Sequence, residues 1–223
     1  MRFLKQFILL SLLLICSESY SQYELPTPVP PGISQSIKAG SLIIPMDTTL
    51  QRLPGYFNLK AYGLVNYLLQ NEVPVRWAIK KNKTKTAIMD TISDFIASSN
   101  RVFPDTSVLS TIKYRSGPFI IDSSWVAIAL PFIAAYETAN GNKISVYKLN
   151  TTTTIDIRYT LTFKPKIYLL NHAGYDTVTV SILKEAGYSN SCYTLSTPFN
   201  QVFNETGKYS LVSDGHYGNG DTT

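Results

Sequence analysis

The chain contains only two histidines, His172 and His216, and histidine is the side chain that most readily exchanges a proton near neutral pH. His172 lies in the segment 171–174, directly after the apolar run 167–170. A loop that follows a buried strand can present a general base or a metal ligand. No second histidine, carboxylate pair or nucleophile is tied to His172 by its spacing. An ordinary loop histidine is therefore the simpler interpretation, and a catalytic histidine is the alternative.

Other polar side chains also follow apolar runs that are predicted to be strands. In an open parallel sheet, ligands bind in the crevice outside the carboxyl ends of the strands. Asp47 and Asp122 are expected at those ends, and with His172 they are weak candidates for catalysis. For an aspartate just before a helix, capping of that helix is the simpler role. The weak candidates for ligand binding are Lys80, Asn171 and Asp176.

The sequence lacks the common catalytic motifs, namely a P-loop, a dinucleotide fingerprint, a Gly-x-Ser-x-Gly elbow and a His-Glu-x-x-His pair. The segment 214–221 is rich in glycine and oxygen donors, but its spacing matches no standard calcium loop. We therefore predict neither a metal nor a cofactor. The lysine-rich segment 80–85 could attract an anionic polymer or surface, and a solvated loop is the alternative. No nucleic-acid-binding motif is recognisable.

The N-terminus has the layout of a cleavable secretory signal peptide over residues 1–21. A positively charged start precedes an apolar stretch at 7–16, and the small residues Ser19 and Ser21 predict cleavage before Gln22. The apolar stretch is shorter than the roughly 20 residues that a membrane span needs. A lipoprotein signal at Cys16 is the alternative, although the residue before it is bulky. The sequence thus predicts a secreted or cell-surface protein without a transmembrane span.

Composition predicts one domain that is stabilised by a hydrophobic core rather than by disulfide bonds. Removal of the signal peptide would take away two basic residues and one acidic residue, which lowers the formal net charge from +5 to +4. Cys192 would then be the last cysteine, so the chain could form no internal disulfide. The apolar content of 44% is ample for a sizeable core.

Apolar runs that alternate with helical patterns predict an α/β fold. After a proline-rich extended leader at 22–40, strands and amphipathic helices alternate, which is typical of parallel βαβ units. We therefore expect a three-layer, mostly parallel α/β domain over 41–223, flavodoxin-like or amidotransferase-like and incomplete at its C-terminus. The segment 86–116 lacks periodicity and is interpreted as an insertion. The expected strands lie near 42–44, 73–79, 119–121, 144–149, 155–163 and 167–170, and the expected helices near 61–68, 126–134 and 178–186.

Four stretches of the chain, 42–47, 57–65, 74–80 and 164–167, resemble the N-terminal module of large exported surface proteins of the Bacteroidota. The layout is also similar, more distantly, to the class I glutamine amidotransferase-like fold. These resemblances imply an exported location, a flavodoxin-like sheet and further domains downstream in the same polypeptide. They imply no mechanism, because the elbow cysteine and paired histidine of that fold are not located in this sequence.

Two functional hypotheses follow. The first is a non-catalytic exported module that binds a surface glycan or a protein partner, or that spaces the domains of a larger protein. The second is a hydrolase-like enzyme with a site around Asp47, Asp122 and His172, completed by residues beyond Thr223. The positions of the three side chains in the fold distinguish between the two.

Overall fold

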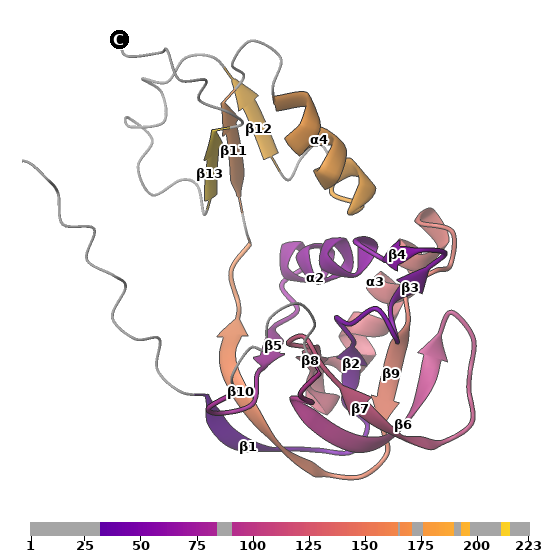
Figure 1. Ribbon diagram of the computed structural model, residues 1–223. Coiled ribbons are helices and arrows are strands. Elements are labelled where there is room, and N and C mark those ends of the chain that lie inside the picture. The colour runs from indigo at the N-terminus through magenta and orange to yellow at the C-terminus, as the bar shows by residue number, and fades with distance from the viewer. Residues whose placement is uncertain are drawn as a thin grey trace, which may run out of the picture. The chain divides into compact units, whose positions relative to one another are not determined.

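The computed structural model describes residues 32–83, 91–164, 166–170, 176–189, 193–196 and 211–214. Within these ranges the main element is an eight-stranded sheet in which every pair of neighbouring strands is antiparallel (Figure 1). In spatial order its strands are β1 (Ile33–Ile37), β10 (Thr153–Leu161), β5 (Val75–Ala78), β8 (Phe119–Ile121), β2 (Leu42–Ile44), β9 (Val146–Leu149), β6 (Phe95–Phe103) and β7 (Ser110–Tyr114).

The four central strands are built from two interleaved β-α-β units. One unit runs from β2 through helix α2 (Lys60–Gln70) to β5, and the other from β8 through the 3-10 turn η1 (Ser123–Trp125) and helix α3 (Val126–Ala139) to β9. Each unit joins two parallel strands, but a strand of the other unit lies between them. The resulting order β5-β8-β2-β9 is that of the split β-α-β, or ferredoxin-like, arrangement.

The expectation of a mostly parallel three-layer sheet is therefore wrong. Alternating strands and helices predict that consecutive strands are neighbours, as in a flavodoxin-like fold. Here each crossover skips one position, and the skipped position holds an antiparallel strand. The sequence pattern along one unit is the same in both cases, because the intercalated strand comes from a distant part of the chain.

Helices α2 and α3 pack on one face of the sheet. Ala61, Leu64, Val65 and Leu68 lie at helical spacing and are buried, which confirms the amphipathic helix expected at 61–68. They meet alternate side chains of the central strands, among them Ile44, in one apolar core. Helix α3 contributes Ala129, Ile133 and Tyr136 to the same core.

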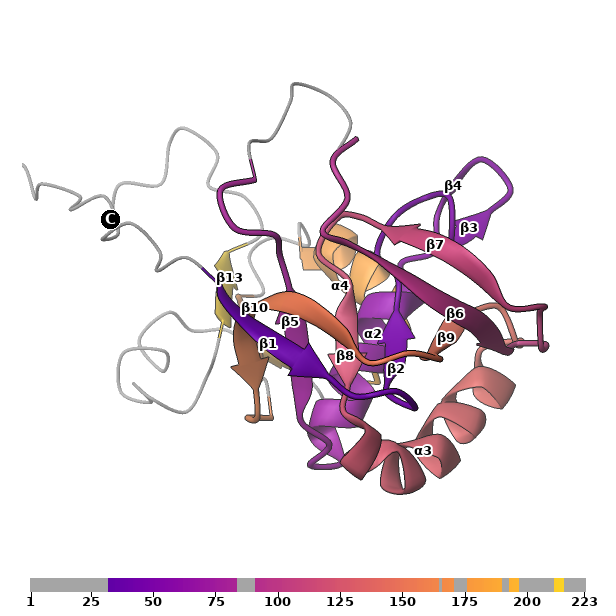
Figure 2. The same ribbon diagram turned by 90° about the horizontal axis from the view of Figure 1, so that it is seen from below.

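The second face of the sheet carries its own apolar core, to which no helix of the described residues contributes. The two flanks of the sheet, β1 with β10 and β6 with β7, bend away from the plane of the central strands (Figure 2). Their side chains join Ile43 and Ile120 of the central strands in this core. The sheet thus curls into a half-barrel. This curl explains why the runs 42–44 and 119–121 are apolar at every position: both faces are buried, but one of them is covered by sheet rather than by helices.

The flanking strands lie partly in segments where no strand was expected. β1 lies within the predicted leader at 22–40, so the sheet begins at Ile33 rather than near Ser41. β6 and β7 form a hairpin within 86–116, between β5 and β8 in the chain. β6 also pairs with β9. The alternating segment 155–163 does form a strand, β10, which joins β1 to the central strands.

Two smaller sheets complete the described structure. β3 (Arg52–Leu53) and β4 (Tyr56–Phe57) form a short hairpin between β2 and α2. Toward the C-terminus, β11 (Ile167–Leu170) pairs in parallel with β12 (Tyr193–Ser196) and β13 (Leu211–Asp214), and helix α4 (Asp176–Glu185) connects β11 to β12. Gly63 of α2 allows a close approach to this part: a Cβ there would lie 1.8 Å from the carbonyl oxygen of Ala186.

Candidate functional site

The antiparallel order of β2 and β8 separates two of the proposed catalytic residues. Ile44 pairs with Phe119 and Leu42 pairs with Ile121, so the C-terminal ends of the two strands point in opposite directions. Asp47 follows one end and Asp122 follows the other. The two carboxylates therefore lie at opposite ends of the sheet and cannot share one crevice.

Asp122 acts as an ion-pair partner and not as the helix cap that its position suggested. Its Oδ2 lies 2.5 Å from a guanidinium nitrogen of Arg76 on β5, and both side chains are about one quarter exposed. Its side chain makes no capping hydrogen bond to η1; instead the carbonyl oxygen of Asp122 accepts from the N–H of Trp125. Asp122 thus ties the start of η1 to β5.

Three of the proposed residues lie at positions that are not described or only partly described. Asn171 and His172 fall outside the described residues. Asp176 begins α4, although its side chain is not described. The helix itself, predicted at 178–186, is confirmed at 176–185.

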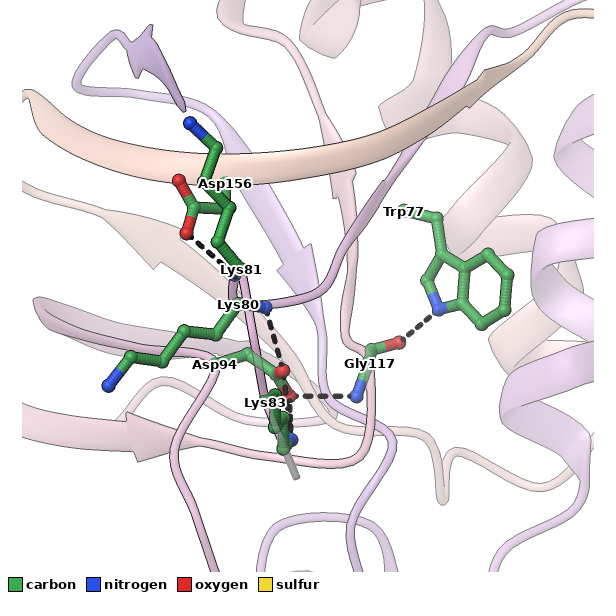
Figure 3. A network of polar contacts seen from close by, with 7 residues as sticks. All are labelled: Trp77, Lys80, Lys81, Lys83, Asp94, Gly117 and Asp156. Carbon is green, nitrogen blue, oxygen red and sulfur yellow. Dashed lines mark hydrogen bonds and ion pairs between the residues drawn. The ribbon is translucent and has the colours of Figure 1, made fainter. Parts of the chain in front are cut away.

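Lys80 belongs to a loop whose backbone is held by two aspartates (Figure 3). The N–H of Lys80 donates to Oδ1 of Asp94 at 3.1 Å, and the N–H of Lys81 donates to Oδ2 of Asp156 at 2.9 Å. The hydrogen bond from the N–H of Lys81, and after it one from the hydroxyl of Ser34, lower the pKa of Asp156. The side chain of Lys80 is directed away from both aspartates in Figure 3.

Asp94 is the centre of this network, although its position in the sequence did not predict it as a site residue. Its side chain is 1% exposed and accepts from the Nζ of Lys83 at 2.8 Å and from the N–H of Gly117 at 2.9 Å. Gly117 in turn accepts from the indole N–H of Trp77 at 2.9 Å. A buried carboxylate with several donors is a structural anchor, so the lysine loop is held in place by its own network.

The interior of the half-barrel is filled by aromatic side chains. The rings of Phe95 and Tyr114 stack with centroids 4.8 Å apart, and Tyr147 meets Tyr114 edge to face at 5.9 Å. The hydroxyl of Tyr114 is hydrogen-bonded to that of Ser99 at 2.6 Å. Burial raises the pKa of Tyr114. The interior is therefore a packed core that leaves no room for a ligand between these rings.

The loop between β2 and α2 lines a pocket of about 410 Å³ on the surface. Five of the described residues line it, namely Thr48, Thr49, Arg52, Gly55 and Tyr56, and we call it the hairpin pocket. Arg52, Gly55 and Tyr56 come from the β3–β4 hairpin, whose turn is Pro54-Gly55. Gly55 has a φ of +89°, which is the conformation that the third residue of a type II turn requires. A Pro-Gly pair between two short β-type segments was the sequence signal for this hairpin.

Two buried amides clamp the base of this loop. The side chain of Gln51 pairs with the backbone of Ser145 twice, with Nε2 donating at 2.7 Å and Oε1 accepting at 2.9 Å. Asn58 donates from Nδ2 to the carbonyl oxygen of Lys143 at 2.9 Å. The N–H of Asn58 also donates to the carbonyl oxygen of Gln51, which closes the loop. Hydrogen bonds at both ends fix the hairpin on the segment 143–145, just before β9, so the pocket is held by a preformed frame.

Asp47 orients the first residues of the same loop. Its side chain is 6% exposed, and its Oδ1 accepts from both the N–H and the hydroxyl of Thr49. Its carbonyl oxygen accepts from the N–H of Gln51 at 2.9 Å. Oδ2 of Asp47 has no hydrogen-bond partner among the described residues. Asp47 therefore holds Thr49 in place and does not itself line the pocket.

Within the described ranges, no group of three or more histidine, cysteine, aspartate or glutamate side chains is arranged to hold a metal ion. The helices of those ranges are also all too short or too polar to cross a membrane.

Comparisons with known proteins place this chain in no family. No family model, curated protein or solved structure matches it. The resemblance to an exported Bacteroidota module and to the amidotransferase-like fold is therefore wrong, because no family match supports it and the main sheet is antiparallel. Four short stretches of sequence can resemble another protein when they form only common elements such as strands, turns and an amphipathic helix, which many folds share.

Proposed function

We propose that this chain is an exported, non-catalytic module that binds a surface glycan through the hairpin pocket. The observation that carries this proposal is the pocket itself. Its lining residues come from the β3–β4 hairpin and the loop before it, and Gln51 and Asn58 clamp that hairpin to the segment just before β9 through hydrogen bonds. Binding sites with fixed frames lose little conformational entropy when they take up a ligand.

The state of the acidic side chains supports a binding role. Asp94 and Asp156 hold the lysine loop, Asp122 pairs with Arg76, and Asp47 holds Thr49. A general acid or base must reach the reacting atoms of a substrate. In the described part of the chain these four carboxylates are engaged in holding loops, and two of them lie at opposite ends of the sheet.

The hydrolase-like alternative now depends on His172 and on carboxylates other than the pair first proposed. It requires a site near His172 that contains at most one of Asp47 and Asp122. Asp47 and Asp122 follow opposite ends of the antiparallel strands β2 and β8, which weighs against a site that contains both of them.

A glycan array tests the binding proposal. The purified exported chain is applied to immobilised neutral and acidic oligosaccharides, beside the double variant Arg52→Ala/Tyr56→Ala. We expect binding to at least one glycan and its loss in the double variant. The matched control, Lys38→Ala/Tyr159→Ala, removes the same kinds of side chain outside the pocket and should bind as the unmodified chain does. Equal binding by the hairpin double variant, or no binding to any glycan, would contradict the proposal.

Export is tested separately from binding. Residues 1–30 are fused to a phosphatase that is active only outside the bacterial cytoplasm, and the processed product is sequenced from its N-terminus. We expect phosphatase activity and a product that begins at Gln22. A charged residue within the apolar stretch, Leu12→Arg, should abolish both results. Phosphatase activity that survives Leu12→Arg would remove the signal peptide from the proposal.

A further inference from the structure

We infer that the hairpin pocket recognises a carboxylate-bearing sugar unit, so that the glycan of the proposed function is an acidic one. This inference rests on the proposed function and adds the chemical class of the ligand. It follows from the donors and acceptors that the five lining residues present.

Arg52 supplies the positive charge of the pocket. It is exposed at the first position of β3, and no acidic side chain among the described residues pairs with it. The other described lining residues are threonine, glycine and tyrosine, so the described lining contains a guanidinium group and no carboxylate. An arginine fork binds a carboxylate through two parallel N–H···O hydrogen bonds. The charge balance therefore favours an anionic group on the ligand.

Thr49 presents a hydrogen-bond acceptor to the ligand, and a simple anion has no donor for it. Its hydroxyl donates its only proton to Oδ1 of Asp47, so towards a ligand it can act as an acceptor but not as a donor. A ligand with a hydroxyl or N–H donor close to its anionic group therefore complements Thr49 better than a simple anion does. Uronic acids and related sugar acids carry a carboxylate and several hydroxyls on one ring.

Tyr56 supplies the apolar surface that a sugar ring needs. Its side chain is 53% exposed although it stands on a clamped hairpin. An exposed aromatic ring next to polar groups is a suitable platform for the C–H face of a pyranose. The volume of about 410 Å³ lies at the lower end of the range for small-molecule sites, which is suitable for one or two sugar units.

A peptide with a free C-terminal carboxylate is the competing occupant. Its carboxylate would suit Arg52, but the lining residues form no apolar cavity for a terminal side chain. Peptide recognition at a carboxylate usually combines backbone capture with such a side-chain pocket. The observations thus favour the sugar acid.

Calorimetric titration with three probes tests the inference on the purified exported chain. The probes are tri-galacturonate, its carboxyl-reduced counterpart and a tripeptide with a free C-terminal carboxylate. We expect tri-galacturonate to bind at least tenfold more tightly than the reduced sugar and the tripeptide. Arg52→Ala should abolish this preference, Arg52→Lys should retain part of it, and Lys38→Ala should leave it unchanged.

The results of the titration distinguish a failure of the inferred acidic ligand from a failure of the proposed glycan binding. If the reduced sugar binds as tightly as tri-galacturonate and both are lost in Tyr56→Ala, the glycan site stands and the acidic class is wrong. If only the tripeptide binds, or if Arg52→Ala leaves the affinity for tri-galacturonate unchanged, the inference is overturned. If no probe binds and the glycan array is also silent, the proposed function itself fails.

Discussion

The carboxylate of Asp94 lies 2.8 Å from the ammonium group of Lys83, and the two side chains are only 1% and 9% exposed. Lys83 follows β5 and Asp94 precedes β6, so this pair brings together the two ends of the segment that connects the strands. The same carboxylate also accepts from the backbone of Lys80 and Gly117. It therefore joins three segments at one end of the half-barrel.

Asp94→Ala should strongly destabilise the fold. The substitution removes the carboxylate that pairs with the buried ammonium group of Lys83, and removing one partner of a buried pair costs about 3–5 kcal/mol. Urea unfolding measures this free energy. The matched control is Asp105→Ala, because Asp105 pairs with Arg101 at an exposed position and such pairs contribute about 1 kcal/mol or less. Equal effects of the two substitutions would show that the Asp94 network contributes little.

Glu137 makes the stability of the fold depend on pH. Its side chain is 2% exposed, and burial raises its pKa from 4.5 to about 7, although a hydrogen bond from the N–H of Ile144 and the charge of Lys60 oppose the rise. The folded state therefore holds this proton more tightly than the unfolded state. Its stabilising effect is complete below pH 4.5 and is lost as the pH rises through about 7. The rise in pKa corresponds to roughly 3 kcal/mol.

Glu137→Gln should remove this pH dependence, because an amide keeps an acceptor for Ile144 and does not titrate. The measurement is the free energy of unfolding of both proteins between pH 4.5 and 8. We expect the variant to gain stability relative to the original chain as the pH rises. Glu72→Gln is the control, since Glu72 pairs with Lys164 at the surface and should give a constant difference. A constant difference for Glu137→Gln as well would contradict the account.

Gly117→Ala should displace Trp77. Gly117 has a φ of +69°, and a Cβ there would lie 2.5 Å from the indole nitrogen of Trp77. Trp77 stacks on Phe119 and Tyr159, with ring centroids 6.0 and 6.2 Å away. We expect a red-shifted tryptophan emission and a loss of stability, because the collision disrupts this stack.

Gly55→Ala is the matched control for the collision. Gly55 also has a positive φ, +89°, but an added Cβ there would meet no atom within 4 Å. It therefore carries backbone strain of about 1–3 kcal/mol without a steric clash. An emission spectrum that is unchanged in both variants would mean that Gly117 does not set the position of Trp77.

Local patterns in the sequence predicted several elements of this fold, but not how the strands pair. The helical spacing of Ala61, Leu64, Val65 and Leu68 depends on neighbouring residues, and it was interpreted correctly. The order of the strands depends on which distant segments pair, and the insertion of β8 between β2 and β5 leaves no local trace. β6 was missed because its partners β9 and β7 determine its burial.

The candidate site was predictable only in part for the same reason. Asp47 was singled out from its place after a strand, and it does lie beside the pocket as the partner of Thr49. Arg52 and Tyr56 were not predicted as site residues, because neither belongs to a recognisable sequence motif. The hairpin turn at Gly55 brings them to one pocket, and the Pro54-Gly55 pair was the local signal of that turn.

The most direct test of the central claim measures binding and turnover on the same sample. Tri-galacturonate, the glycan probe used above, is incubated for a day with an equal concentration of the exported chain, and both the bound fraction and the sugar products are analysed by mass spectrometry. The account predicts saturable binding and the recovery of intact tri-galacturonate. Shorter sugars that appear with the original chain and disappear with His172→Ala would contradict it and establish an enzyme.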